Sequence, residues 1–171
     1  MHEILILYIL LDAQNTMYGI FKVISKNFGF ITNPSFGTID PALKRLQKQN
    51  YVISNKLFSD GGKPYYYYSI TPEGKEFLIK KIKEKPCLNP IQAYPEIKIK
   101  LICSNILDDS EKKSLYKLLK PEIIKIKTKA EEVLKSEVFS ANHFARIVVD
   151  NTVCECKNMY DLIEGLEKCL Q

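Results

Sequence analysis

Residues 35–53 read SFGTIDPALKRLQKQNYVI and predict a short basic helix that leads directly into a β-strand. Four apolar residues recur at helical spacing and predict the face that packs into a core: Ile39, Ala42, Leu43 and Leu46. Lys44 and Lys48 fall on the opposite face, and Arg45 borders that face. The strand-forming residues 51–53 follow at once. We therefore expect a helix with one buried face and one cationic face, positioned at the edge of a sheet.

Two further helices are predicted before this segment. The unbroken apolar run at residues 4–11 predicts a buried first helix. An apolar stripe at helical spacing predicts a second helix over residues 17–28, with Asn15 or Thr16 as its cap and Gly29 at its end. The basic helix is therefore the third in succession.

A hairpin and a fourth helix are predicted after it. Residues 51–58 and 65–70 are rich in aromatic and β-branched side chains and are joined by SDGGKP at 59–64. The residues TPE at 71–73 predict the start of a helix that runs to about Lys85. Three helices followed by a hairpin are the layout of a winged helix-turn-helix. In that layout the third helix enters the DNA major groove and the hairpin, called the wing, reaches the flanking backbone or minor groove.

The second half of the sequence predicts helices only. A short helix is expected around residues 95–105, and a second begins at Asp108 or Asp109, where Pro121 should interrupt or kink it. In a third helix, from about residue 142 to 170, eight residues alternate at spacings of four and three: Ala145, Val149, Thr152, Cys156, Met159, Ile163, Leu166 and Leu170. Such a seam packs against a second chain, against the preceding helix of the same chain, or against both. Near its middle, the polar Thr152 and the small Cys156 leave room for a ligand.

The predicted fold class is mainly α. It combines a winged helix-turn-helix (three helices, a β-hairpin wing and the following helix) with a C-terminal helical dimerisation domain. The proposed boundary, marked by Pro86 and Pro90, gives a winged-helix DNA-binding domain at 1–85 and a helical dimerisation domain at 86–171.

Charge is distributed unevenly between these halves. Residues 1–85 hold 12 Lys and Arg against 7 Asp and Glu, and 12 minus 7 gives a net charge of +5. Residues 86–171 hold 13 of each, so their net charge is zero. Only the first half therefore suits a polyanion such as DNA.

Other classes of protein fit the sequence less well. The apolar run at 4–11 is shorter than the roughly 20 residues that span a bilayer, and no secretory leader precedes it, so we expect a cytoplasmic protein with reduced cysteines. Cys154 and Cys156 would lie about 200° apart on a helix and the histidines are few, so no metal site is expected. No cluster of nucleophile, base and orienting acid is visible. We expect neither an enzyme nor a cofactor.

Four blocks in the first half resemble the PadR family of bacterial transcriptional regulators. They are YG at 18–19, SFGTIDPALKRL at 35–46, GGKP at 61–64 and YYSITPEG at 67–74. Residues 95–119 resemble the start of the helical C-terminal region in the longer class of PadR proteins. The resemblance implies a homodimeric DNA-binding protein, usually a repressor of a palindromic operator, that is often released by a small-molecule effector.

The predicted functional residues fall into two groups. The expected contacts with double-stranded DNA are Ser35, Phe36, Thr38, Pro41, Lys44, Arg45, Lys48 and, in the wing, Lys63. The expected dimer interface consists of Val149, Thr152, Cys156, Met159, Ile163, Leu166 and Leu170.

The sequence departs from the family pattern at two places. The family commonly has Tyr where this chain has Asp40, and a carboxylate there would repel phosphate unless it turns inward or caps the helix. The family wing usually has Arg at the position of Lys63, with basic residues at the positions of Tyr65 and Tyr66. Asp40 adds negative charge to the predicted DNA-binding surface, and Tyr65 and Tyr66 remove positive charge from it.

Pro41 makes the start of the third helix ambiguous. Local rules favour Asp40 as the cap and Pro41 as the first helical residue. The resemblance instead implies a start near Ser35 with Pro41 in the second turn. We expect a distorted helix that begins at 34–36.

Two alternatives stay open. The four tyrosines at 65–68 can pack into the core, which we favour, or form a stacking platform for bases. A winged helix can also serve as a protein-interaction module without specific DNA binding. A steep weakening of duplex binding by salt would distinguish a DNA-binding regulator from such a module.

Overall fold

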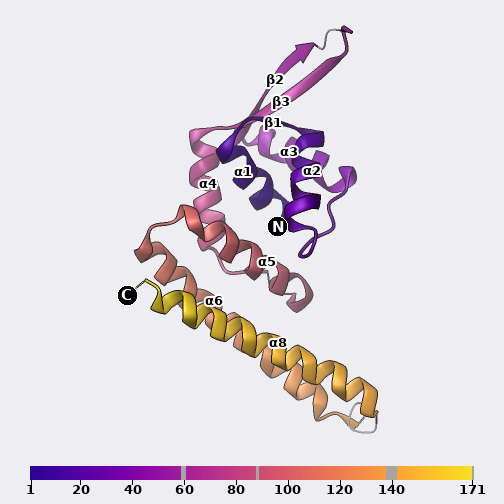
Figure 1. The fold of residues 1–171 in the computed structure, drawn as a ribbon, viewed down its shortest axis with the longest axis vertical. Coiled ribbons are helices and arrows are strands. Elements are labelled where there is room, and N and C mark those ends of the chain that lie inside the picture. The colour runs from indigo at the N-terminus through magenta and orange to yellow at the C-terminus, as the bar shows by residue number, and fades with distance from the viewer. Residues whose placement is uncertain (59–60, 88, 138–141, 171) are drawn as a thin grey trace. The chain divides into compact units, whose positions relative to one another are not determined.

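The computed structural model describes residues 1–58, 61–87, 89–137 and 142–170. The chain forms two compact units. The first unit consists of Met1–Glu84 and Lys98–Ile106, and the second consists of Lys85–Ile97 and Leu107–Gln171. The structure confirms the predicted fold class of a mainly helical chain that contains a winged helix-turn-helix (Figure 1).

The first unit contains four helices and a small sheet. The helices are α1 (His2–Asp12), α2 (Met17–Phe28), α3 (Phe36–Lys48) and α4 (Pro72–Lys83). The strands are β1 (Asn15–Thr16), β2 (Val52–Phe58) and β3 (Pro64–Ile70), antiparallel in the order β1-β3-β2. The predicted three helices, hairpin and fourth helix are confirmed, whereas the two-residue β1 was not predicted, because it is too short to show a strand pattern.

Helix α1 is the centre of the first core. Six of its residues are buried: Ile4, Leu5, Ile6, Leu7, Ile9 and Leu10. It contacts α2, α3, α4 and β3, so apolar residues are needed all round the helix rather than on one stripe. At about 1.5–3 kcal/mol for each fully buried side chain, this helix is a main contributor to the stability of the unit. The predicted buried first helix is confirmed.

Helix α3 begins where the resemblance, rather than the local rule, places its start. Ser35 is the N-cap, and residues 36–48 are α-helical without a break although Pro41 lies inside. The missing N–H of Pro41 leaves the Gly37 carbonyl without its helical partner, and both residues are exposed, so water can satisfy that carbonyl. The predicted start at 34–36 is confirmed.

The prediction that the tyrosine tract packs into the core is wrong. Tyr66 is exposed and the other three tyrosines are only half-buried. The rings of Tyr65 and Tyr67 meet edge to face, with centroids 5.7 Å apart. The hairpin extends beyond the helices of its own unit (Figure 1), so most of this tract has no core to enter.

A buried lysine connects two segments of the first unit. Lys100 is 1% exposed. Its ammonium donates hydrogen bonds to the carbonyl oxygens of Lys81, Ile82 (3.3 Å) and Glu84 (2.9 Å). These carbonyls lie at the C-terminal end of α4, where no further helical N–H is available to them.

The remaining helices are α5 (Pro90–Cys103), the 3-10 turn η1 (Ser104–Ile106), α6 (Asp109–Leu134) and α8 (His143–Lys168). Helix α5 starts five residues earlier than predicted, because Asn89 caps its first turn. The Asn89 side chain accepts a hydrogen bond from Ile91 N at 3.0 Å, and the Asn89 backbone carbonyl accepts one from Ala93 N at 2.8 Å. The predicted interruption at Pro121 does not occur, since α6 continues through it. Pro121 has no N–H group to donate to the Lys117 carbonyl. Both residues are exposed, so water can satisfy that carbonyl.

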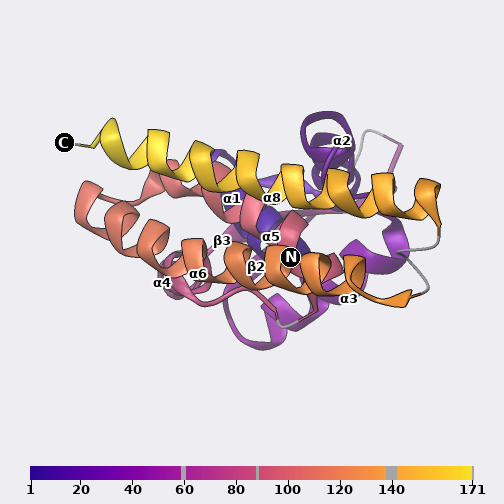
Figure 2. The ribbon, with the colours of Figure 1, turned by 90° about the horizontal axis from the view of Figure 1, so that it is seen from below.

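Helices α6 and α8 form an antiparallel pair in the second unit (Figures 1 and 2). Lys120 of α6 bridges to Glu167 (2.5 Å) and Glu164 (3.8 Å) of α8. The Tyr94 hydroxyl donates to the Glu155 carbonyl at 3.0 Å and joins α5 to α8. Across the described residues, every helix is too short or too polar to cross a membrane.

Candidate nucleic-acid interface

The first turn of α3 uses its own hydroxyl groups to fix the helix start. Ser35 N donates to Thr38 Oγ1 at 3.0 Å, and Thr38 Oγ1 donates to the Ser35 carbonyl at 2.9 Å. The two hydroxyl oxygens lie 3.3 Å apart. Ser35 and Thr38 are exposed, but their polar groups are already engaged, so positioning the helix is the role that the geometry shows for them.

Lys44 is exposed on α3 as predicted, but it is paired with a carboxylate. Its ammonium lies 2.7 Å from Asp40 Oδ2, and its side chain is 72% exposed. The hydrogen bond to Asp40 raises the pKa of Lys44 above its ordinary value, so this lysine stays charged near neutral pH. Asp40 therefore neither caps the helix nor turns inward. Instead it offsets the charge of the neighbouring lysine.

Arg45 is also paired. Its Nε lies 2.8 Å from Glu3 Oε1 of α1, and both side chains reach the surface. Lys48 has no ion-pair partner among the described residues and is exposed. The three cations and two carboxylates sum to +1, so the surface of α3 carries less net charge than its own lysines and arginine suggest.

Three aromatic rings lie stacked beside the start of α3. Phe36 and Phe21 are 4.6 Å apart between centroids with planes at 20°, and Tyr18 lies 6.4 Å from Phe36 at 13°. Phe21 is half-buried, whereas Tyr18 and Phe36 are exposed. Phe36 was predicted from the sequence and its two partners were not, because a stack between α2 and α3 depends on how the helices pack.

The wing carries fewer charges than apolar groups. Lys63 is exposed near its tip and follows Gly62, whose φ of +72° favours glycine; residues 59–60 of the predicted turn lie outside the described residues. A second cation, Lys56, was missed and lies over the Phe58 ring at 5.2 Å. The alternation of side chains between the two faces of β2 could have suggested that Lys56 is exposed on the wing. Four exposed side chains make the wing unusually apolar: Ile53, Leu57, Phe58 and Tyr66.

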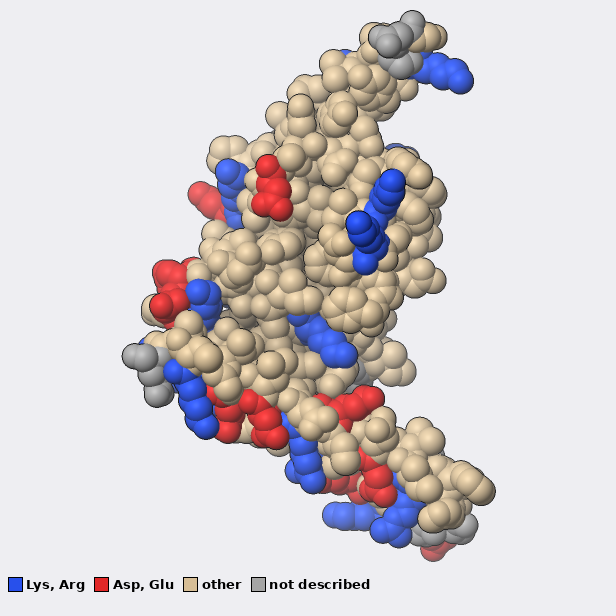
Figure 3. Space-filling model, in the orientation of Figure 1, with Lys and Arg blue, Asp and Glu red and all other residues tan. Residues whose placement is uncertain are grey.

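The surface charges of the two units differ. On the face in Figure 3, the winged-helix unit is mostly uncharged with scattered Lys and Arg side chains and a few acidic ones, whereas α6 and α8 display many acidic and basic groups close together. This agrees with the balanced charge of the second half of the sequence.

The predicted dimer seam lies within the second unit. Cys156, Met159 and Ile163 are buried, and the other predicted interface residues are half-buried: Val149, Thr152, Leu166 and Leu170. The seam faces α6 of the same chain, which is the intramolecular alternative left open by the sequence. A role in a dimer stays a prediction. The apolar groups of this helix pair that remain exposed are Ile124, Phe144, Ile147, Val148 and Leu162.

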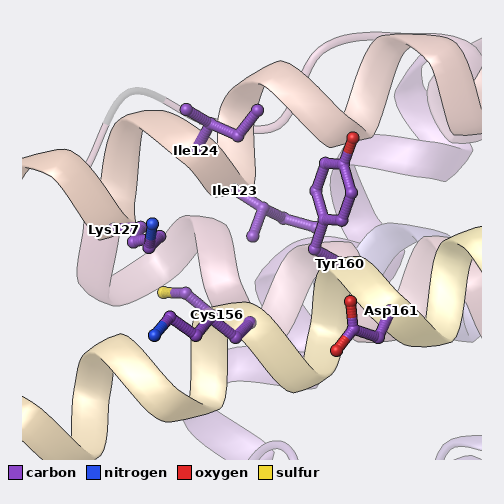
Figure 4. A pocket seen from close by; sticks show the side chains of 7 residues that line it. Ile123, Ile124, Lys127, Cys156, Tyr160 and Asp161 are labelled. Atoms are coloured by element: carbon purple, nitrogen blue, oxygen red, sulfur yellow. The ribbon is translucent and has the colours of Figure 1, made fainter.

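Two cavities border the seam, each of about 300 Å³. Side chains from α6 and α8 line the first, shown in Figure 4: Ile123, Ile124, Lys127, Cys156, Lys157, Tyr160 and Asp161. The second is lined by Ile91, Tyr94, Pro95, Ile126, Thr152, Glu155 and Cys156. Both are mostly apolar with a few polar groups, which is typical of sites for small molecules.

The cysteines are free thiols, and two of them are buried. Burial raises the pKa of Cys103 to about 12 and also raises the pKa of Cys156. These thiols are therefore neutral and weakly nucleophilic at ordinary pH. In the part of the chain that the structure describes, no group of three His, Cys, Asp or Glu side chains is arranged to hold a metal ion.

Comparison with known proteins identifies related regulators. Residues 6–80 match the transcriptional regulator PadR-like family. The chain is 34% identical to a PadR family transcription regulator from Clostridium difficile, over 47% of this chain and 81% of that one, with a TM-score of 0.42. A search of curated proteins finds no significant match.

Two structures of Bacillus subtilis PadR are similar over nearly the whole chain. One, in complex with operator DNA, is 15% identical over 99% of this chain and 98% of that one, with a TM-score of 0.48. The other, in complex with p-coumaric acid, is 17% identical over 98% and 94%, with a TM-score of 0.42. TM-scores below 0.5 support no transfer of structural detail, so the family assignment rests on the matched sequence.

Proposed function

The chain belongs to the PadR-like family of transcriptional regulators, a family of regulators rather than enzymes, and from this we propose that it is a homodimeric repressor that binds a palindromic operator in double-stranded DNA. A regulator of this kind acts where the chromosome lies, so a cytoplasmic location is part of the proposal. The predicted division into a DNA-binding domain at 1–85 and a dimerisation domain at 86–171 belongs to it as well.

The exposed face of α3 is the observation that carries this proposal. Ile39 and Leu43 are buried and hold one side of the helix in the core, so Lys44 and Lys48 lie on the side that faces solvent. The winged-helix layout places such a face in the major groove and the wing, with Lys63, against the flanking backbone. A DNA phosphate that binds Lys44 competes with Asp40 for this cation, and one that binds Arg45 competes with Glu3.

Dimerisation would supply the affinity that one short helix cannot. Two winged helices related by a two-fold axis would contact half-sites about 34–36 Å apart. Binding of the second half-site then becomes intramolecular, which raises avidity by roughly 100-fold or more. Exposed apolar groups of α8, such as Val148 and Leu162, are available for such an interface because the heptad seam is already covered by α6.

A small-molecule effector is the third part of the proposal. The two cavities beside Cys156 lie in the second unit and have apolar walls with Lys127, Thr152 or Tyr160 at their edges. A ligand there would separate or tighten α6 and α8 and so change the surface available for dimerisation. Release of the operator would follow from altered spacing of the two winged helices.

A second candidate function is a protein-interaction module, and the exposed apolar wing favours it. Ile53, Leu57 and Phe58 face solvent on β2, where a wing that contacts DNA backbone ordinarily carries cations. A protein partner would cover these groups.

Fragment selection and salt dependence test the proposal together. Purified protein is mixed with fragments of the source genome, bound duplexes are recovered, and affinity for the best duplex is measured across salt concentrations. Lys44→Ala, Lys48→Ala should weaken binding and reduce the log-log salt slope by about 0.9 for each phosphate that the variant no longer neutralises. An intact double variant with unchanged affinity and slope would refute this use of α3, and failure of the wild type to select any duplex would favour the protein-interaction module.

A further inference from the structure

The aromatic stack beside α3 is an unusual surface feature. Tyr18 is 62% exposed and Phe36 is 44% exposed, although both are large apolar groups on a helical unit with a well-filled core. The planes of these two rings are nearly parallel, and the half-buried ring of Phe21 stacks with both. Packing of α2 against α3 would need only the buried part of this stack, so the exposed part is available to a ligand.

Phe36 occupies the first position of α3. Side chains of a helix lean toward its N-terminus, so this ring extends past the end of the helix. By helical geometry it borders the face that carries Asp40 and Lys44, on the side next to α2. In a helix-turn-helix, the N-terminal residues of the recognition helix are those that reach base edges.

The first turn of α3 offers apolar surface rather than hydrogen-bonding groups. Ser35 and Thr38 bond to each other, and Gly37 has no side chain. Phe36 is therefore the side chain of this turn that remains for contact with a base. In the major groove, the apolar group that distinguishes one base from the others is the 5-methyl group of thymine.

We infer that Phe36 contacts the 5-methyl group of a thymine in each operator half-site and thereby determines part of the sequence specificity. Phe21 and Tyr18 act as positioning residues, because the stack holds the ring in one orientation before DNA binds. This inference rests on the proposed function and names the chemistry by which one position of the operator is read.

Replacement of thymine by 2′-deoxyuridine tests the inference, because it removes only the methyl group. In the duplex selected by the wild type, each thymine is replaced in turn. At one position of the half-site, affinity should fall about 4-fold for one substituted half-site and about 16-fold for both, as expected for one methyl group removed from an apolar contact.

Binding of the Phe36→Ala variant to the uracil-substituted duplex shows whether this ring makes the contact. The variant should bind more weakly than the wild type and should no longer distinguish thymine from uracil at that position, because the two changes remove the same contact. Phe30→Ala is the matched control. Phe30 is 75% exposed but follows the far end of α2, which is about 18 Å long, so this variant should keep the full preference for thymine.

A measurement on the wild type alone covers the case in which Phe36→Ala misfolds. With 5-iodouracil in place of that thymine, irradiation should crosslink the DNA to the peptide that contains Phe36, which mass spectrometry identifies. Uniform tolerance of uracil, a thymine preference that persists in Phe36→Ala, or a crosslink to another peptide would overturn the inference. Each of these results leaves the proposed function intact, whereas a wild type that selects no duplex would overturn both.

Discussion

Lys100→Met should destabilise the winged-helix unit strongly. The substitution keeps the unbranched apolar stem and removes the ammonium that donates to the carbonyls of Lys81, Ile82 and Glu84. Hydrogen bonds to a charged group contribute about 1.5–3 kcal/mol each. They do not add fully, because the buried ammonium itself loses hydration on folding. We expect the free energy of unfolding to fall by about 3–5 kcal/mol, because a buried acceptor left without a donor costs about 1–3 kcal/mol and two of the three carbonyls are only partly buried.

Urea denaturation followed by circular dichroism measures this decrease in stability. With a slope of about 1–3 kcal/mol per molar urea, the midpoint should fall by roughly 2 M. Protein concentration is kept constant, because dimerisation would make the midpoint depend on it. Lys80→Met is the matched control, since Lys80 is exposed on the last turn of the same helix. Its free energy of unfolding should change by less than about 0.5 kcal/mol.

The opposite outcome has a clear physical meaning. If Lys100→Met unfolds at the same midpoint as the wild type or at a higher one, the cost of burying the ammonium equals or exceeds the benefit of its three bonds. The end of α4 would then be held by apolar packing alone, and the reasoning above would be wrong.

Three further predictions concern DNA binding and assembly. Asp40→Asn should tighten duplex binding several-fold at low salt, because it removes a carboxylate from the interface and releases Lys44 for phosphate; equal or weaker binding in a titration would contradict this. Lys63→Glu should weaken binding to operators of different sequence to a similar extent, whereas an effect confined to one base position would indicate base readout instead. Val148→Asp should yield a folded monomer by light scattering, whereas Met159→Asp should unfold the second unit, because Met159 is buried against α6; a folded monomer from Met159→Asp would place the seam between chains.

Features that depend on neighbours in sequence were predicted well. Thr16 and Thr71 accept hydrogen bonds from the N–H groups three residues later, and Asp108 forms a capping box with Glu111. Each of these signals needs only a side chain and the backbone of the next turn. For the same reason the bounds of α2, the hairpin strands and α4 agree with the sequence pattern to within about two residues.

Features that depend on packing between distant segments were missed. The pair of Arg45 with Glu3 spans 42 residues, and Lys100 bonds to carbonyls 16 to 19 residues away. The sequence shows the charges but not which of them meet. The tyrosines illustrate the same limit, because alternation indicates which side chains share a face but not whether any element covers that face.

The paired charges on α3 have a consequence for affinity, but not for specificity, under the proposed function. Non-specific binding to DNA is almost entirely electrostatic, and it competes with the operator at a very large number of genomic sites. Asp40 and Glu3 reduce the net charge that α3 presents, so they weaken binding to every sequence about equally. Contacts that depend on base identity, such as the one inferred for Phe36, are not weakened by this reduction. The ratio of specific to non-specific affinity therefore stays the same, and Asp40→Asn should bind operator and unrelated DNA more tightly by the same factor. A competition titration against unrelated duplex measures that ratio directly, and a variant whose ratio differs from that of the wild type would show that Asp40 also affects a contact that depends on base identity.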